Sequence, residues 1–458
     1  MSLNDNHKKL LLPYQINDVE NMVRIIKKNN TGLNSGSTGT GKTYTTVCAC
    51  SVLKLRPIVI CPKAVISSWI KVCNIFNVEP FFIVNYESIK NMKYYDKNRN
   101  RIKCPYITYN DDENKYEWLN LPNDIIFIFD EVHKCSNISS QNGLLLLSAK
   151  ESAKKPILLL SATIADNAER FRIFFYILNF IDISSMPKNT DFKKYIKIVE
   201  AWIFRQQKPM LAIHNMIYPD RGTAMRIDVL GDLFPETQII AQPYTMGKTR
   251  EVQIQYQYEE INREIEILKD KTQKDKGNIL VKVLRAHQKI EILKIPTIVE
   301  LTRGFIEEGN SIVIFVNFTK TLKTLAEILN TNCLIYGEQT QQDREINIDD
   351  FQSNKERLII CNIKAGGVGI SLHDIHGKHM RVSLISPSFS SIDMVQALGR
   401  VHRAGGLTKS LQRIIYCANT VEEKIADKLQ IKLKNLNEIN NGDVDLSNIV
   451  FEKKQIEI

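Results

Sequence analysis

The sequence lacks the cysteine patterns that mark disulfide frameworks and structural metal sites. Nine cysteines are scattered over 458 residues, with no Cys-x-x-Cys pair and no Cys/His cluster at zinc spacing. This cysteine usage predicts reduced thiols and an intracellular location, in the cytoplasm or the nucleus. For a viral chain, the virion is the alternative location. The sequence also lacks a hydrophobic signal core at its start and any apolar run near the roughly 20 residues that span a bilayer. No membrane partner is therefore expected.

Acidic side chains are the minority among the charged residues. Asp and Glu number 51 against 61 Lys and Arg, which gives a formal net charge of +10 and a pI of about 9.0. Such a balance suits a polyanionic partner such as nucleic acid, although many basic proteins bind none. An apolar content of 43% and a charged content of 24% are ordinary for a soluble globular protein. At this length about two or three domains are expected.

One stretch fits the pattern G-x-x-x-x-G-K-[ST] at every fixed position. Glycines let successive backbone N–H groups point inward around phosphate oxygens, and the start of the following helix favours the same anion. The lysine is expected to reach the β- and γ-phosphates and the threonine to hold Mg²⁺. A plain glycine-rich turn would not need Lys-Thr after its last glycine, so the stretch predicts a nucleoside triphosphate site. It consists of Gly36, Ser37, Thr38, Gly39, Thr40, Gly41, Lys42 and Thr43.

A glutamine stands shortly before this loop. Gln15 ends a Leu-Pro-Tyr-Gln stretch and precedes a helix-like run at residues 18–26. Its amide carries a donor and an acceptor side by side, which could read an adenine edge. The alternative is an ordinary loop residue, and the position just upstream of the phosphate loop favours the adenine contact.

An acidic pair follows a buried strand. The continuous apolar run at residues 125–129 predicts a central parallel strand, and Asp130 and Glu131 come directly after it. A carboxylate at such a strand end can hold Mg²⁺, here Asp130, and the next one can orient and deprotonate the attacking water. The apolar run at residues 156–160 predicts another strand, and the small residues after it could hydrogen-bond the acidic turn. These are Ser161, Ala162 and Thr163.

Two further strands are predicted at residues 57–62 and 81–87. They place Lys63 and Asn85 at strand ends, where α/β proteins bind ligands, although each alone would be an ordinary loop residue. Residues 91–122 break the alternation and predict a surface hairpin. Its aromatic side chains could stack on bases, but packing of the hairpin on itself is the favoured interpretation.

The remainder of the first half, residues 167–235, has a mostly helical pattern. Phe171, Phe174, Phe175 and Tyr176 give it an apolar face, which predicts core packing rather than a cofactor site.

The second half begins the strand–helix alternation again from about Gln238, so a second parallel α/β domain is predicted. Residues 256–309 have helical periodicity, and residues 364–372 are glycine-rich after a predicted strand. Arg400 and Arg403 are three residues apart, which predicts one helix face. Because their neighbours are mostly small or apolar, they indicate arginine fingers for a nucleotide rather than a solvated basic face.

Together, these ordered motifs resemble those of the superfamily-two helicases and translocases over roughly residues 10–428. The resemblance implies an α/β fold of two RecA-like parallel-sheet domains in tandem, with ATP and Mg²⁺ in the cleft between them. The expected bounds are 1–235, with a 91–122 insertion, then 236–430, then a tail at 431–458. It further implies adenine recognition by Gln15, coupling by Ser161, Ala162, Thr163, Gly367 and Gln396, and nucleic-acid contacts by Lys63, Asn85, Asn317 and Gly366.

Within that superfamily the Swi/Snf-type branch is the most similar, and a viral DEAD/DEAH-like helicase is the alternative. The similarity rests on the Leu-Pro-Tyr-Gln stretch, on residues 61–69 and on residues 400–405, while Val132 stands where a smaller residue is usual. This branch implies ATP-driven movement on DNA. RNA helicase activity, an ATP-gated clamp, and a motor subunit with protein partners in a transcription or restriction complex remain alternatives.

Overall fold

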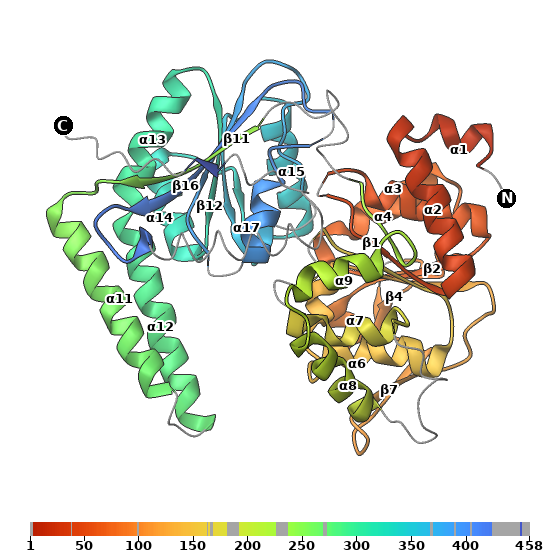
Figure 1. Ribbon diagram of the computed structural model, residues 1–458. Coiled ribbons are helices and arrows are strands. Elements are labelled where there is room, and N and C mark those ends of the chain that lie inside the picture. Colours follow the sequence, from red (N-terminus) through yellow and green to blue (C-terminus); the bar gives the residue numbers. More distant parts are fainter. Residues whose placement is uncertain are drawn as a thin grey trace. The chain divides into compact units, whose positions relative to one another are not determined.

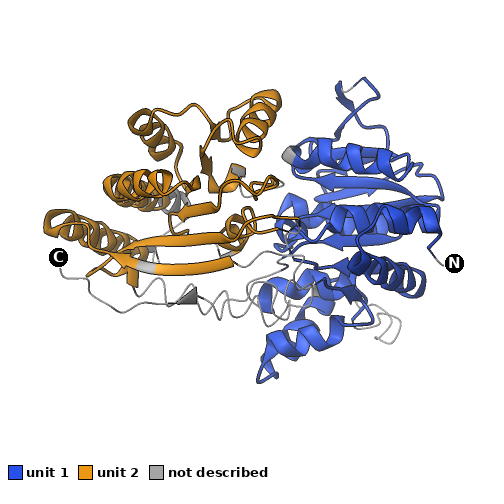
Figure 2. Ribbon diagram, turned by 90° about the horizontal axis from the view of Figure 1, so that it is seen from above, with its two compact units in different colours: residues 1–231, 434–444 blue, residues 232–433, 445–458 orange. Residues whose placement is uncertain are grey.

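The computed structural model describes residues 3–37, 39–98, 100–162, 164, 168–180, 192–225, 237–268, 273–366, 370–388, 391–403, 405–423 and 449–450. The chain divides into two compact units, residues 1–231 with 434–444 and residues 232–433 with 445–458 (Figure 2). Each unit is built around its own parallel sheet with helices packed against it (Figure 1). The expected tandem of two parallel α/β domains is therefore confirmed.

The first unit has a six-stranded sheet in the order β10-β1-β9-β8-β2-β3, and every described pairing in it is parallel. Four of its strands are the apolar runs predicted from the sequence. Two others were not anticipated, because they are short and consist of glycine, threonine and asparagine with Leu33 as their single apolar residue. The bounds are β1 (Thr31–Asn34), β2 (Arg56–Cys61), β3 (Phe82–Asn85), β8 (Ile125–Asp130), β9 (Ile157–Leu160) and β10 (Gly222–Thr223).

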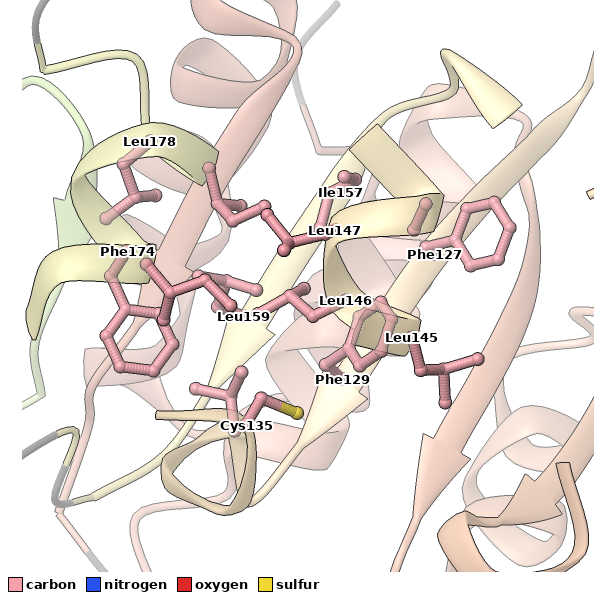
Figure 3. Close-up of a cluster of buried hydrophobic side chains, with 14 of the residues drawn as sticks. Phe127, Phe129, Cys135, Leu145, Leu146, Leu147, Ile157, Leu159, Phe174 and Leu178 are labelled. Carbon is pink, nitrogen blue, oxygen red and sulfur yellow. The ribbon is translucent and has the colours of Figure 1, made fainter. Parts of the chain in front are cut away.

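Helices surround this sheet. Phe171, Phe174 and Phe175 lie in the core as predicted, with Tyr176 partly buried against it, and Figure 3 shows three leucines of α6 beside the phenylalanines of β8. Among described residues, no helix combines the length and apolar character needed to cross a bilayer. The helices are α1 (Asp5–Lys9), α2 (Pro13–Asn29), α3 (Lys42–Leu53), α4 (Ile66–Ile75), α5 (Tyr86–Ile89), α6 (Gln141–Ser148), α7 (Arg172–Ile177), α8 (Phe192–Phe204) and α9 (Pro209–Ile217), with short turns η1 (Lys63–Val65), η2 (Val132–Cys135), η3 (Ala149–Ala153) and η4 (Ala168–Phe171).

The insertion contains two hairpins, β4 (Lys93–Tyr95) with β5 (Arg101–Lys103) and β6 (Ile107–Asn110) with β7 (Lys115–Trp118). The interpretation that it packs only on itself is wrong, because Tyr94 of the first hairpin packs against Phe82 of β3 and the second hairpin contributes to the core. Because successive strand residues alternate between faces, one face of β7 is turned into the core of the unit. Tyr116 and Trp118 are buried there; the Trp118 Nε1–H donates to Ser148 Oγ at 3.0 Å, and the Tyr116 hydroxyl donates to the Lys90 carbonyl at 2.9 Å.

The second unit has a seven-stranded sheet in the order β13-β14-β12-β15-β16-β11-β17, again with parallel pairings. Strand and helix alternate along it as predicted. The strands are β11 (Thr237–Tyr244), β12 (Ser311–Val316), β13 (Leu334–Ile335), β14 (Leu358–Asn362), β15 (Arg381–Ile385), β16 (Ser410–Cys417) and β17 (Ile449–Val450). The helices are α11 (Lys248–Leu268), α12 (Gln273–Leu293), α13 (Ile295–Glu307), α14 (Thr319–Leu329), α15 (Gln341–Gln352), α16 (Ile363–Gly366) and α17 (Ser391–Leu398).

Helices α11 and α12 form a long antiparallel pair that extends away from this sheet (Figure 1). The predicted helical region at residues 256–309 is thus three helices, with α13 as the third. Two buried carboxylates fasten the base of the pair to strand ends. Glu291 accepts from the backbone N–H of Asn317 at 2.7 Å, and Glu422 lies 2.6 Å from the Lys294 ammonium and accepts from the Tyr258 hydroxyl at 2.9 Å. The pair is therefore tied to the sheet rather than loosely appended.

Candidate ATP site and nucleic-acid interface

The parallel sheet of the first unit gathers the predicted site residues at one edge. Carboxyl ends of parallel strands meet at the same side of a sheet, which is where α/β proteins bind ligands. The phosphate loop follows β1, Asp130 ends β8 with Glu131 next, and Ser161 follows β9. In the strand order, β9 lies between β1 and β8, so these three segments are neighbours.

The phosphate loop has the geometry that its glycines require. Gly41 caps the start of α3 with a φ of 90°, and a Cβ there would lie 2.1 Å from the amide nitrogen of Gln15. No side chain fits at that point, because Gln15 fills the space and the positive φ favours glycine. The Lys42 ammonium donates to the carbonyls of Gly36 at 2.5 Å and Ser37 at 3.1 Å. Thr38 lies outside the described residues.

Gln15 is part of the loop's support. Its amide nitrogen donates to the Thr40 carbonyl at 2.9 Å, and its amide oxygen accepts from the backbone N–H of Leu12 at 2.9 Å. These bonds tie the start of α2 to the phosphate loop. Both polar ends of the amide thus have protein partners, and adenine recognition by this residue stays a prediction.

A buried polar network behind the loop was missed in the sequence, because none of its members belongs to the phosphate-loop pattern. Asn34, the last residue of β1, accepts from the backbone N–H of Gly36 at 3.0 Å and donates to Thr45 Oγ1 at 3.1 Å. Its amide also donates to Asp18 at 3.4 Å. Burial raises the pKa of the Asp18 carboxyl to about 6, against opposing hydrogen bonds and the Lys42 charge. One asparagine therefore holds both the loop and the first turns of α3.

Asp130 is held in place from two sides. The Trp69 indole N–H donates to one carboxylate oxygen at 2.9 Å, and the backbone N–H of Glu131 donates to the other at 3.0 Å. Burial, and then the neighbouring Glu131 charge, raise the pKa of the Asp130 carboxyl to about 6, while the Lys42 charge acts in the opposite direction. The Lys42 charge acts on the Asp130 carboxyl because the phosphate loop and the acidic turn lie at the same edge of the sheet.

A histidine links the acidic turn to the next strand. His133 Nδ1 lies 3.1 Å from Ser161 Oγ and 3.3 Å from a Glu131 carboxylate oxygen. The sequence predicted contact between Ser161 and the acidic turn, but it did not indicate His133 as the intermediary. Val132, the unusual residue of the motif, is fully buried in the core, so its larger side chain is accommodated. Ala162 follows Ser161 and is buried, and Thr163 lies outside the described residues.

The predicted nucleic-acid residues of the first unit differ in exposure. Lys63 is exposed at the start of η1, directly after β2. Asn85 is 4% exposed; its amide nitrogen donates to Glu87 at 2.8 Å, and its amide oxygen accepts from the Tyr95 hydroxyl at 2.9 Å. Asn85 is thus engaged inside the unit, whereas Lys63 is available at its surface.

In the second unit, Asn317 follows β12 and its amide nitrogen donates to Glu291 at 2.9 Å. The carbonyl of Asn317 accepts from the Asn362 amide at 2.9 Å, so two strand ends are joined. Gly366 ends α16, and Gly367 lies outside the described residues.

The two arginines do not share a helix face, and that prediction is wrong. Helix α17 ends at Leu398, and the Arg400 backbone N–H bonds the Ala397 carbonyl, three residues back, which tightens the chain out of the α-helix. Arg400 is 2% exposed and donates to the Ile370 carbonyl at 3.2 Å. Arg403 is half-buried and donates to Ser371 Oγ at 2.7 Å. Both guanidiniums therefore contact the end of the glycine-rich stretch, and Gln396 is buried on α17.

These residues fit ATP and Mg²⁺. The Gly41 position leaves no room for a side chain, the Lys42 ammonium lies among the loop carbonyls, and the half-buried Asp130 carboxylate is close enough for the Lys42 charge to act on it. Thr43 and Asp130 offer hydroxyl and carboxylate oxygens, which are ligands that Mg²⁺ prefers.

Comparison with known proteins adds two family matches. Residues 8–166 match the family described as type III restriction enzyme, res subunit, and residues 293–405 match the helicase conserved C-terminal domain. The structure of Saccharomyces cerevisiae Dbp5 bound to RNA and ADP BeF3 superposes with a TM-score of 0.48 at 14% identity, covering 93% of each chain.

Several relatives extend over most of the chain, and two of them cover more than nine-tenths of it. The ATPase of the ISWI chromatin-remodeling complex of Saccharomyces cerevisiae is 22% identical over 93% of this chain, which spans 40% of that relative. A protein of Acanthamoeba polyphaga mimivirus, named for a proposed ATP-dependent RNA helicase activity, is 38% identical over 97% of this chain and 86% of its own length. Identity at this level over nearly the whole of both proteins shows that the chain belongs to the superfamily-two helicases, a family of nucleic-acid-dependent ATPases.

Proposed function

We propose that this protein is an ATP-driven translocase that moves along duplex DNA. The observation that carries the proposal is the convergence of the phosphate loop, Asp130-Glu131 and Ser161 at one sheet edge, with His133 between the acidic turn and Ser161. Through these contacts, a change at Glu131 during ATP hydrolysis would shift His133 and then Ser161 at the end of the neighbouring strand β9. An ATP-gated clamp that binds nucleic acid without moving would not need Glu131 to orient a water for hydrolysis.

The proposed chemistry assigns one task to each residue. Lys42 neutralises charge on the β- and γ-phosphates, Thr43 and Asp130 hold the cation, and Glu131 orients the attacking water. Bound Mg²⁺ would supply charge neutralisation on the phosphate oxygens. Gln15 positions the loop and is proposed to meet the adenine.

The second domain is proposed to complete the ATP site. With domains of 1–235 and 236–430, Arg403 and Arg400 would reach the γ-phosphate when the domains close around the nucleotide. Because Arg400 is nearly fully buried and Arg403 is half-buried, Arg403 is the proposed contact and Arg400 supports it. Gln396 and the Gly366-Gly367 segment would transmit the closure.

Duplex DNA is the favoured track for two reasons. The motifs around Gln15, Lys63 and Arg400 are similar to the Swi/Snf-type branch, and a remodelling ATPase is among the relatives. The net charge of +10 suits a sequence-independent grip on phosphates. Exposed Lys63 and the strand-end segments at Asn317 and Gly366 are the proposed contacts, with Asn85 as an internal support.

RNA helicase activity is the second candidate, because the 38% identical mimivirus relative is named for it. A role as the motor of a larger restriction or transcription assembly is a further alternative, since the first family match is to a restriction-enzyme subunit. In that case partner proteins would supply the remaining activities.

The deciding experiment measures ATP turnover with matched duplex DNA, single-stranded DNA and RNA of the same sequence at two salt concentrations. Duplex DNA should stimulate turnover at least as well as single strands, independently of sequence, and strand separation should be weak. Stimulation by RNA alone would replace the DNA proposal with the RNA one. Absence of stimulation by every nucleic acid would refute both.

A further inference from the structure

The small hairpin formed by β4 and β5 presents a basic face. Its antiparallel register sets Lys93 opposite Lys103 and Tyr95 opposite Arg101. Residues directly opposite each other share a face, and so do residues two apart on one strand. These four side chains therefore lie on the same side of the hairpin. All three cations are exposed, and none has an ion-pair partner in the part of the chain that the structure describes.

The opposite side of the hairpin fixes its orientation. Tyr94 packs edge-on against Phe82 of β3, with ring centroids 5.4 Å apart, and against Tyr106 at 6.5 Å. On the basic side, the Tyr95 hydroxyl donates to the amide oxygen of Asn85 at 2.9 Å. Asn85 ends β3, so the basic face is tethered to the sheet edge that carries the ATP motifs.

The placement of two lysines in register is costly for the hairpin itself. Like charges directly opposite on paired strands are destabilising. A lysine on an exposed strand can also serve to prevent edge-to-edge aggregation. One lysine is enough for that purpose, so it does not explain why Lys93 and Lys103 stand opposite each other. A sugar-phosphate backbone would offset the repulsion, because it supplies negative charge along its length.

We propose that the face formed by Lys93, Arg101, Lys103 and Tyr95 binds the sugar-phosphate backbone of the duplex DNA on which the ATPase acts. The inference rests on the proposed function and adds a second grip to it, separate from the motif loops. Lysines and arginine meet phosphates without reading bases, so the contact is independent of sequence.

The test compares two triple variants of the full chain. One carries Lys93→Gln, Arg101→Gln and Lys103→Gln. The matched control carries Lys27→Gln, Lys54→Gln and Lys154→Gln, which removes the same charge. These three lysines are exposed and stand before β1, β2 and β9, at the opposite edge of the same sheet.

Affinity for a labelled duplex DNA is measured over a salt series. The slope of log affinity against log salt is negative, and each lost phosphate contact reduces its magnitude by about 0.9. The magnitude for the hairpin variant should therefore be smaller than that of wild type by about 2 to 3. The control should keep the wild-type slope. Equal slopes for the hairpin variant and wild type would overturn the inference, and an equal loss in the control would mean that net charge alone matters.

Thermal unfolding separates binding from a structural role. Lys93→Glu, which creates a cross-strand pair with Lys103, should raise the unfolding temperature while weakening DNA binding. A lower unfolding temperature together with weaker binding would make the lysine structural and overturn the inference. If wild-type turnover responds to no nucleic acid, the proposed function fails first; if it responds and the slopes match, only the hairpin surface fails.

Discussion

At the start of α3, the Lys42 ammonium rests on the carbonyls of Gly36 and Ser37, and its charge reaches Asp130. Replacing it with alanine should lower ATP turnover by about 10²- to 10³-fold, the usual effect of losing one positioned electrostatic contact. The fold should remain, because the side chain lies in the loop and not in the apolar core. Turnover and circular dichroism of Lys42→Ala check this.

Lys54→Ala, at the other end of α3, is the control for Lys42→Ala and should keep normal turnover. A folded Lys42→Ala protein with wild-type turnover would contradict the assignment of the phosphate loop.

Asp18 predicts a pH dependence of stability. Its pKa is raised to about 6 by burial, above the ordinary 3.8, so the native state favours the protonated carboxyl. The native state then binds more protons than the unfolded chain between about pH 4 and 6, and ionisation of this group lowers stability as pH rises through that window. Asp18→Asn should therefore raise the free energy of unfolding at pH 7.5, by at most about 3 kcal/mol, and change it little at pH 4.

Chemical denaturation of Asp18→Asn and wild type at both pH values measures this difference. Asp124→Asn is the control, because that carboxylate is at the surface and pairs with Arg56. An equal gain at both pH values would show that the Asp18→Asn substitution acts through packing and not through the lost charge.

Arg403 offers a test of the proposed arginine finger. Arg403→Ala should lower turnover by about 10³-fold with little change in ATP affinity, since its contact would form only on closure. Arg403→Lys should not restore turnover, because an ammonium lacks the planar fork. Single-turnover hydrolysis and ATP binding are the two measurements, with Arg303→Ala on the exposed side of α13 as control. Unchanged turnover in Arg403→Ala would contradict the arginine-finger role and leave Arg403 with only its structural hydrogen bond to Ser371.

At the scale of elements, the β6–β7 hairpin belongs to the core of its unit. Trp118 is buried against Phe127, with ring centroids 4.7 Å apart, and its indole bonds Ser148. Trp118→Ala should cost about 3 to 5 kcal/mol of unfolding free energy, as large-to-small core changes do. Thr108→Ala, on the exposed face of the same hairpin, should cost little. Urea unfolding compares the two.

The insertion at residues 91–122 could also act as a wedge for strand separation, although surface packing is the favoured interpretation. Deleting residues 94–118 would remove core side chains, so loss of unwinding in that deletion would not identify a wedge. Shortening the turn at residues 111–114 leaves Tyr116 and Trp118 in place, so it tests the wedge without disturbing the core.

For the stability prediction, a Trp118→Ala protein as stable as wild type would show that the packing described for the β6–β7 hairpin is wrong.

The whole molecule is tested by a variant that binds but does not hydrolyse. Glu131→Gln keeps the Asp130 carboxylate and removes the group that orients water. It should bind ATP with Mg²⁺, hydrolyse slowly and hold nucleic acid more tightly when ATP is present, because the cycle stops in the closed state. Nucleic-acid affinity with and without ATP is the measurement, and Glu117→Gln on β7 is the control. Loss of ATP binding in Glu131→Gln would make the residue structural.

The sequence by itself determined the features that are local in the chain. The phosphate loop is eight consecutive residues whose glycines and lysine specify a conformation and a charge, and its place before a helix followed directly, whereas the strand before it did not. Apolar runs such as residues 125–129 predicted buried parallel strands, because only a strand covered on both faces can be apolar throughout. Together with strand–helix alternation, they were enough for two parallel α/β domains.

Only the tertiary structure decided what depends on partners distant in the chain. Asn34 and Asp18 support the loop because a β-strand and a helix meet, His133 reaches Ser161 because β8 and β9 are neighbours, and Trp118 is core because α6 packs on β7. The Arg400–Arg403 spacing suggested a helix, yet the chain leaves α17 before both residues and turns Arg400 inward. A three-residue spacing fits a helix and a tight turn equally, and the choice was made by the packing of segment 370–371 against the guanidiniums.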